Sequence, residues 1–270
     1  MRKLNFFLDI DGTLLPFGKS LPESAAKAIE DATKCGHRFF LATGRSIAEI
    51  DPTLKALPLK GGVFSAGSVV IFEGKEIHRR VFSTEDKAFI FDYVKKNNLE
   101  ILIQSADGTY LSERAMELFV TLMTKYVGRV LDVPNLKVMN TFPDDLEVFK
   151  LLFFSLDGRV GEIRKELAGR FVVVDNTVGL PYEIMAEVVL PNLTKATGIE
   201  AVLEYLGDDR SSVVAIGDGA NDIEMVEYAA LGIAMGNAQQ ELKDIASYIS
   251  DDVERDGLKK AIEYAIEKKA

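Results

Sequence analysis

Two carboxylates stand at the end of an apolar run near the amino terminus. Asp9 and Asp11 follow residues 4–8 (LNFFL), a segment typical of a buried strand. Side chains two positions apart on a strand share a face, so these acids converge on one point, and Gly12 permits a sharp exit from it. Two adjacent carboxylates repel each other and raise the free energy of the fold unless a cation or a shared proton offsets their charges. Clusters of carboxylate oxygens suit magnesium. A simple Asp-Gly turn would also explain these residues, but the full DIDGT segment favours a functional site over a turn.

A second polar group follows the next predicted strand. Thr43, Gly44 and Arg45 end the strand predicted over 37–43, just before a predicted helix. The Thr43 hydroxyl, the following backbone N–H groups and the helix amino terminus can together hold an anion, for which phosphate is the natural guest. A glycine between strand and helix is more often only a turn, but the position after the second strand favours an anion site.

More carboxylates end a late strand, in residues 217–222 (GDGAND). Asp218 and Asp222 are four residues apart and can face one way. One acid at a helix start is an ordinary cap. Two strand ends that each carry Asp, with glycines clearing space, instead predict a magnesium site in which Asp9, Asp11 and Asp218 supply oxygens beside water and substrate phosphate.

Lys195 lies at the start of a predicted helix. Lysines at helix starts are usually solvated, and the helix dipole also disfavours a cation there. Four acids and a dianionic phosphate, however, need more than one cation for balance. A lysine that reaches the phosphate oxygens would help to hold the nucleophile and the phosphorus together.

Both ends of the chain alternate strand and helix. A capping-box pattern from Ser20 to Glu23 and a closing Gly36 predict a first helix, and a second is expected after Ser46. The other elements expected are a hairpin over 69–82, helix 196–206, strand 213–217, a helix from 222, strand 232–235 and a final helix to 269. This α/β alternation predicts a Rossmann-like parallel sheet core covered on both faces, built from residues 1–83 and 188–270.

The alternation of predicted strands and helices changes in the middle of the chain. Residues 84–187 predict an inserted α+β cap domain, with helices at its start and over 113–127 and strands over 99–104, 109–112 and 150–156 and near 171 and 182. An insertion above the strand ends of an open α/β sheet lies beside the place where such sheets bind ligands. We expect it to close over the substrate and to set specificity. Arg114, Tyr126 and Tyr182 are its candidate contacts.

Composition excludes several classes of protein. With 270 residues, 47% of them hydrophobic, the chain can bury a sizeable core. Its formal net charge of −10 disfavours a nucleic acid or an anionic membrane as the main partner. The first apolar run is too short for a signal peptide and Cys35 has no partner for an internal disulfide, so a cytoplasmic location is expected. The sequence has no GxGxxG motif after a predicted strand, so a nicotinamide or flavin cofactor is not expected. A monomer or weak homodimer is expected.

The order DIDGT, TGR, Lys195 and GDGANDIEM resembles the haloacid dehalogenase superfamily of phosphotransferases. The large insertion after TGR resembles its Cof-type sugar-phosphate phosphatases, and residues 235–238 (MGNA) are also similar to that family. One departure is visible. Cof-type relatives usually carry Asn-Gly after the third strand, where this chain has residues 65–68 (SAGS).

The resemblance implies a role for each matching residue. It makes Asp9 the nucleophile and Asp11 the general acid and base, and it makes Asp218 a ligand of Mg²⁺ together with these two. The residues that it implies around the phosphate or substrate are Ile10, Thr43, Gly44, Arg45, Lys195 and Asn221, with Asp222 supporting them.

The predicted function is Mg²⁺-dependent hydrolysis of a small phosphorylated metabolite, above all a sugar phosphate, through an aspartyl-phosphate on Asp9. A phosphomutase would pass the same phosphoryl group to a second hydroxyl, and the sequence leaves this alternative open. A non-catalytic binder of phosphate ligands would not need Asp11 beside Asp9. A dehalogenase would need neither Asp11 nor a metal.

Overall fold

The computed structural model describes residues 3–130, 133–176 and 179–269. The chain divides into two compact units. The core unit comprises Met1–Arg45, Ile50–Arg79 and Thr194–Ala270, and the inserted unit comprises Ser46–Glu49 and Arg80–Leu193. The predicted fold class, a parallel α/β sheet with an inserted α+β part, is confirmed.

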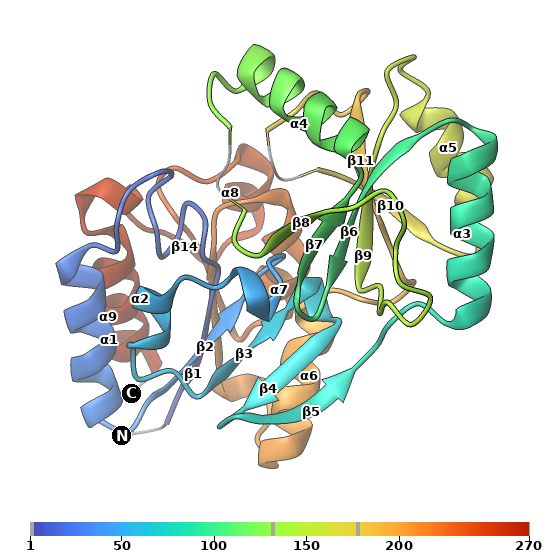
Figure 1. Ribbon diagram of the computed structural model, residues 1–270. Coiled ribbons are helices and arrows are strands. Elements are labelled where there is room, and N and C mark those ends of the chain that lie inside the picture. Colours follow the sequence, from blue (N-terminus) through green and yellow to red (C-terminus); the bar gives the residue numbers. More distant parts are fainter. Residues whose placement is uncertain (1–2, 131–132, 177–178, 270) are drawn as a thin grey trace. The chain divides into compact units, whose positions relative to one another are not determined.

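A mixed sheet forms the middle of the core unit (Figure 1). From β14 to β3 each strand runs parallel to its neighbour, whereas β4 and β5 form an antiparallel hairpin at one edge. In the part of the chain that the structure describes, the strand order is β14 (Tyr248–Ile249), β13 (Leu231–Ala234), β12 (Val213–Gly217), β1 (Asn5–Leu8), β2 (Arg38–Ala42), β3 (Gly61–Phe64), β4 (Val69–Phe72) and β5 (Lys75–Arg79).

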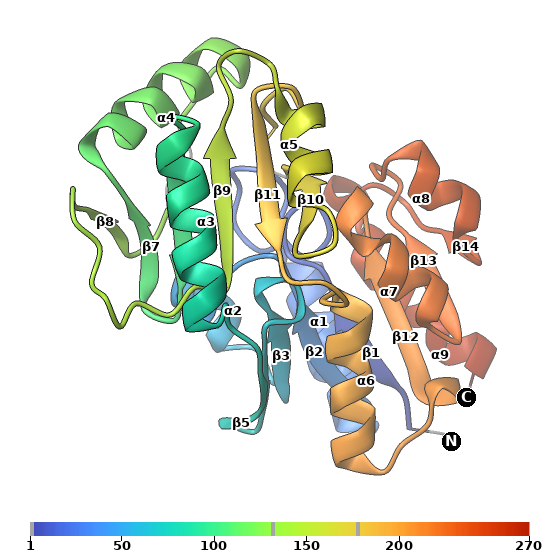
Figure 2. The same ribbon diagram turned by 90° about the vertical axis from the view of Figure 1, so that its right-hand side faces the viewer.

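Helices cover both faces of this sheet (Figures 1 and 2). On one face α6 (Lys195–Leu206), α7 (Ile223–Tyr228) and α8 (Gln240–Ile245) share a core with Phe7 and Phe40. On the other, α1 (Glu23–Lys34) and α9 (Gly257–Lys269) pack against each other and contact β2 and β12. Burial on both faces explains why the central strands are continuous apolar runs.

The register of the central strands brings distant loops together. β1 lies between β12 and β2, with Leu8 opposite both Ile216 and Leu41. The N–H of Asp9 continues the ladder by donating to the carbonyl of Ile216 at 3.0 Å. Because parallel strands end at the same edge, the residues after β1, β2 and β12 are neighbours.

The inserted unit is a sheet with a helical layer on each face. The described residues give the strand order β10 (Val172–Asp175), β11 (Met185–Val189), β9 (Lys150–Phe154), β6 (Glu100–Ser105), β7 (Gly108–Leu111) and β8 (Leu136–Val138). Alternate residues of β6 face opposite ways: Ile101 and Ile103 pack with α3 (Thr84–Lys96) and α5 (Val160–Leu167), whereas Leu102 packs with α4 (Glu113–Tyr126). The domain boundaries expected between residues 83 and 84 and between residues 187 and 188 both lie inside this unit. The second boundary falls within β11, which pairs with β9 in the same sheet.

A short segment after Arg45 also belongs to the inserted unit. The carboxylate of Glu49 accepts hydrogen bonds from Gln104 Nε2 at 2.8 Å and Thr109 Oγ1 at 2.5 Å. The helix predicted after Ser46 is interrupted. A 3₁₀ turn is followed by the four-residue α2 (Pro52–Lys55), because Pro52 starts a new helix.

The capping box predicted from Ser20 to Glu23 is wrong. Pro22 is the N-cap of α1, and no side chain caps that helix end. The predicted hairpin is confirmed, and its turn residues Glu73 and Gly74 both have positive φ (46° and 78°), as a tight hairpin turn requires.

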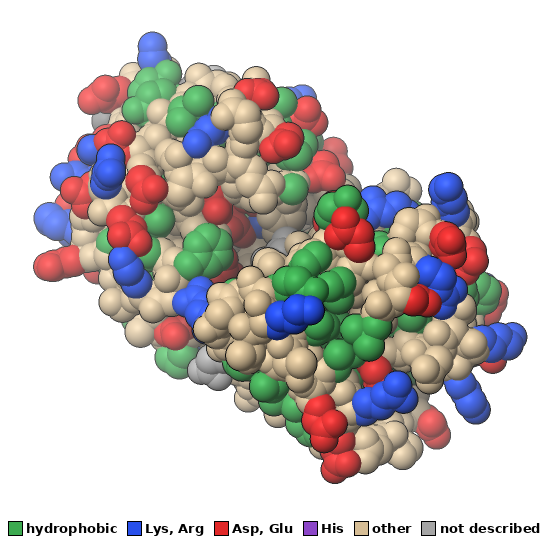
Figure 3. Space-filling model, turned by 90° about the horizontal axis from the view of Figure 1, so that it is seen from above, with side chains coloured by type: hydrophobic (Ala, Val, Ile, Leu, Met, Phe, Trp, Pro, Cys, Tyr) green, Lys and Arg blue, Asp and Glu red, His purple; other side chains and the backbone are tan. Residues whose placement is uncertain are grey.

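One face of the molecule carries mixed charge. On the face that Figure 3 shows, acidic and basic side chains are interspersed, with small patches of hydrophobic side chains between them. Among the described residues, no helix has both the length and the apolar character that crossing a bilayer requires.

His37 gives the core unit a pH-dependent contribution to stability. Its buried Nδ1 accepts a hydrogen bond from the Leu4 N–H at 3.2 Å, and burial lowers the pKa of His37 below its usual 6.5. The neutral form therefore stabilises the fold fully above pH 6.5, and this stabilisation is lost as the pH falls below that value.

His37→Asn keeps an acceptor that does not titrate. We expect its unfolding free energy to fall less steeply below pH 6.5 than that of the unmodified protein, by at most about 1.4 kcal/mol per pH unit. Urea denaturation at several pH values measures this, and parallel curves would contradict it.

Candidate active site

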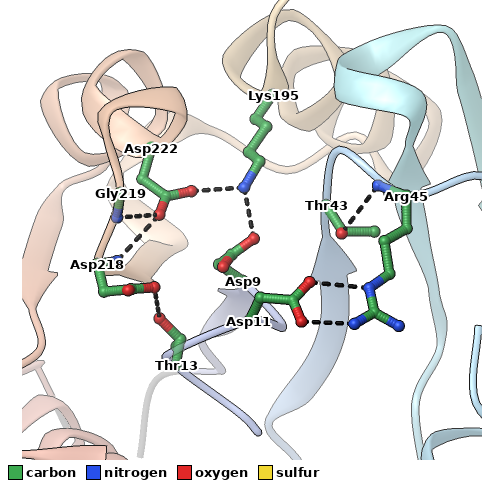
Figure 4. A network of polar contacts seen from close by, with 9 residues as sticks. All are labelled: Asp9, Asp11, Thr13, Thr43, Arg45, Lys195, Asp218, Gly219 and Asp222. Carbon is green, nitrogen blue, oxygen red and sulfur yellow. Dashed lines mark hydrogen bonds and ion pairs between the residues drawn. The ribbon is translucent and has the colours of Figure 1, made fainter. Parts of the chain in front are cut away.

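Four segments of the core unit meet at one edge of its sheet (Figure 4). The loop 9–13 follows β1, the segment 43–45 follows β2, the loop 218–222 follows β12, and Lys195 is the first residue of α6. The residues that the sequence placed at strand ends are therefore neighbours, as the parallel register requires.

Lys195 joins two of these segments through a buried ion-pair network. Only 1% of its surface is exposed, and its Nζ donates to Asp9 Oδ1 at 2.6 Å and to Asp222 Oδ1 at 2.5 Å. Burial disfavours the ammonium form, but Asp222 and Asp9 outweigh it and raise the pKa of Lys195. A reciprocal capping box between Thr194 and Thr197 starts α6 and fixes the backbone position of Lys195 at its first turn.

Asp222 holds the loop after β12. While one oxygen accepts from Lys195, its Oδ2 accepts from the backbone N–H groups of Asp218 and Gly219 at 2.9 and 3.0 Å. Because both oxygens are engaged, Asp222 supports the loop and orients Lys195; its role in supporting phosphate binding stays a prediction.

Asp218 faces the loop after β1. Its Oδ1 accepts from Thr13 Oγ1 at 3.0 Å. A Cβ added to Gly12 would lie 2.1 Å from Asp218 Oδ2, and Gly12 has a φ of +88°, so only glycine fits here. Burial, then the repulsion of Asp222, raises the pKa of Asp218 to about 7. The sequence assigned Gly12 only the sharp exit from the strand and assigned Thr13 no role, although both lie in DIDGT.

The donor set suits a divalent cation. Carboxylate oxygens of Asp9, Asp218 and Asp222 lie within 4.8 Å of one another. Burial, then Asp222, raises the pKa of Asp9 well above its usual value despite the opposing effect of Lys195. Three buried carboxylates against one lysine leave an excess of negative charge, and a hard cation with oxygen ligands would remove it.

The Asp11 carboxylate points away from this group. It accepts from Arg45 Nε at 2.8 Å and from an Arg45 terminal nitrogen at 2.5 Å (Figure 4). Both side chains are partly exposed. The structure thus brings Asp9 and Asp218 together and places the Asp11 carboxylate on the side of Arg45.

The segment after β2 is braced by the turn that replaces Asn-Gly. Thr43 is buried, and its Oγ1 accepts from the Arg45 N–H at 3.1 Å. The Ser65 N–H donates to the Arg45 carbonyl at 2.8 Å, and the Ala66 N–H donates to the Thr43 carbonyl at 3.0 Å. Ser65 and Ala66 have φ values of +48° and +55°, a conformation that costs a non-glycine residue about 1 kcal/mol. The backbone of this turn therefore supports the segment after β2 without an asparagine side chain.

Other predicted residues lie around this centre. The Ile10 side chain is buried, so only its backbone can meet a ligand. Gly44 lies between Thr43 and Arg45, and Asn221 is half-buried in the 3₁₀ turn after Gly219.

The candidate contacts of the inserted unit do not form one group. Arg114 lies at the start of α4, pairs with Glu100 and lines a cavity of about 470 Å³. Tyr126 ends the same helix, about 18 Å away along its axis. Tyr182 is 61% exposed in the loop before β11.

Known proteins are similar to this chain in sequence and in fold. Residues 6–262 match the model of a family described as haloacid dehalogenase-like hydrolase. The YkrA protein of Bacillus subtilis is 32% identical over 96% of this chain and 96% of its own length. The 5-amino-6-(5-phospho-D-ribitylamino)uracil phosphatase YcsE of the same organism is 27% identical over 95% of this chain and 93% of its own. A solved structure from Geobacillus kaustophilus is 26% identical, covers 98% of this chain and 99% of its own, and superimposes with a TM-score of 0.84. The chain therefore belongs to the haloacid dehalogenase-like hydrolases.

Proposed function

We propose that this hydrolase is a Mg²⁺-dependent phosphatase that cleaves small phosphate monoesters, sugar phosphates above all, through an aspartyl-phosphate on Asp9. The observation that carries the proposal is the position of Asp9. Its carboxylate is buried at the end of β1, oriented by Lys195 and close to Asp218. A carboxylate fixed in this way beside cationic groups is suited to attack phosphorus.

The reaction would proceed in two steps. Asp9 attacks phosphorus, the bond from phosphorus to the ester oxygen breaks, and Asp11 gives a proton to the departing alcohol. Asp11 then takes a proton from water, which attacks the phosphorus of the aspartyl-phosphate, releases inorganic phosphate and restores Asp9. Arg45 orients the Asp11 carboxyl through two hydrogen bonds.

The remaining residues would bind the phosphoryl group. Lys195, Thr43 and the backbone after Thr43 hold its oxygens, with Asn221 nearby and Asp222 keeping Lys195 in place. Asp9 and Asp218 would hold Mg²⁺, whereas the carboxylate of Asp11, the third ligand predicted from the sequence, is turned toward Arg45. When bound, Mg²⁺ supplies positive charge that stabilises the phosphoryl oxygens in the transition state.

The substrate class rests on two arguments. Lys195 is the buried cation beside Asp9, an arrangement suited to one phosphoryl group. YcsE acts, by its name, on a compound with a phosphorylated ribityl chain. The inserted unit would supply the contacts that select the alcohol part of the substrate, a role typical of segments that cover a reaction site.

One assay tests this proposal. Sugar phosphates, nucleotides and pyridoxal phosphate are each incubated with the protein in Mg²⁺ and, separately, in EDTA. We expect phosphate release from at least one sugar phosphate in Mg²⁺ only. Conversion of a hexose phosphate to an isomer without free phosphate would indicate a phosphomutase instead, and ligand binding without turnover of any compound would contradict the proposal.

A further inference from the structure

Asn237 connects the two acidic loops of the site. It follows β13 in the MGNA segment, and its Nδ2 donates to the Gly12 carbonyl at 2.8 Å. The same nitrogen lies 3.5 Å from Asp218 Oδ2, a long contact. Its Oδ1 accepts from the Val253 N–H at 3.0 Å. One amide therefore contacts the loop after β1, the loop after β12 and the turn before α9.

The orientation of this amide is determined by its partners. Turning it over would set its oxygen against the Gly12 carbonyl and its NH₂ against the Val253 N–H, losing both hydrogen bonds. The nitrogen must therefore face Gly12. Gly12 lies between Asp11 and Thr13, so a hydrogen bond to its carbonyl can fix the position of the loop 9–13.

The segment that carries Asn237 is itself anchored to the Asp218 loop. The Met235 N–H donates to the Gly217 carbonyl and the Gln239 N–H to the Asp218 carbonyl, each at 2.9 Å. Gly236 packs so closely on the turn 250–252 that a Cβ there would lie 2.5 Å from the Asp252 nitrogen. Asn237 thus projects from a segment fixed to one acidic loop and holds the other.

We propose that Asn237 is a positioning residue that sets the separation of Asp9 and Asp218 and thereby the affinity of the site for Mg²⁺. The proposal rests on the function proposed above. Groups that orient metal ligands typically change metal affinity by about 10- to 100-fold when they are removed. Asn237 acts here through the Gly12 carbonyl and the backbone of the Asp218 loop.

The test is calorimetric titration with Mg²⁺ alone, without substrate. Asn237→Ala is expected to weaken Mg²⁺ binding by about 10- to 100-fold, and kcat at subsaturating Mg²⁺ should fall in parallel. Asn176→Ala is the matched control. Asn176 also joins backbone groups, donating to the Leu180 and Met185 carbonyls and accepting from the Leu180 N–H, but it lies in the inserted unit. It should lower stability and leave the Mg²⁺ dissociation constant unchanged.

A folded Asn237→Ala protein that binds Mg²⁺ as tightly as the unmodified protein would overturn the inference. If that variant does not fold, Asn237→Ser decides, because its shorter hydroxyl can serve only one of the two backbone partners. It should bind Mg²⁺ about tenfold more weakly, and unchanged binding would again overturn the inference. Failure of the proposed function would look different: the unmodified protein would bind Mg²⁺ but release no phosphate.

Discussion

Asp9→Asn should abolish turnover while leaving the fold intact. We expect kcat for phosphate release to fall by at least about 10⁴-fold, because an amide cannot form an acyl phosphate. The amide keeps the size of the side chain and an oxygen to accept from Lys195 Nζ. It also removes one of three crowded buried carboxylates, so the unfolding free energy should be unchanged or higher. Steady-state phosphate release and urea denaturation measure the two effects.

Asp208→Asn is the matched control for this variant. Asp208 accepts from Asn5 and Arg38 at the opposite end of the central strands, so its loss should change stability alone. Turnover retained in Asp9→Asn, or lost equally in both variants, would contradict the assignment of Asp9 as nucleophile.

Lys195→Met should reduce both catalysis and stability. Its Nζ is the shared partner of Asp9 and Asp222, and without it two buried carboxylates lose their counter-charge. Removing one partner of a buried ion pair costs about 3–5 kcal/mol. Losing a cationic group aimed at the developing charge lowers kcat by about 10²- to 10³-fold. The measurements are kcat with saturating substrate and the unfolding free energy in urea.

Lys150→Met separates the two effects. Lys150 forms a buried pair with Glu187 at 2.7 Å in the inserted unit, so the same substitution there should also destabilise the protein. Its kcat should stay within a few-fold of the unmodified protein. If both lysine variants lost kcat in proportion to their stability, Lys195 would have only a structural role.

The sequence predicted the part of the site that follows from strand order. Asp9 and Asp218 are distant along the chain, yet each ends an apolar run in an alternating α/β pattern, and parallel strands end at one edge. Their proximity follows from this topology, and the structure agrees. The core sheet and the inserted α+β unit were predictable for the same reason, since long periodic segments are clear signals.

What the sequence could not predict depends on contacts between distant side chains. From its helix-start position Lys195 is expected to be solvated, and only Asp9 and Asp222 make its burial possible. The Arg45–Asp11 pair has no sequence signature. Glu49 joins the inserted unit through Gln104, which is remote in sequence. The very short β8 and β14 also escaped prediction, since two or three residues carry no periodicity.

The most direct test is to locate the phosphoryl group during turnover. A sugar phosphate that the protein hydrolyses, labelled with ³²P, is mixed with the Mg²⁺-loaded protein and quenched in acid within milliseconds, and the labelled peptide is identified by mass spectrometry. We predict acid-stable label on Asp9 in the unmodified protein and none in Asp9→Asn. Label on any other residue, or a burst of alcohol product with no labelled protein, would contradict the account.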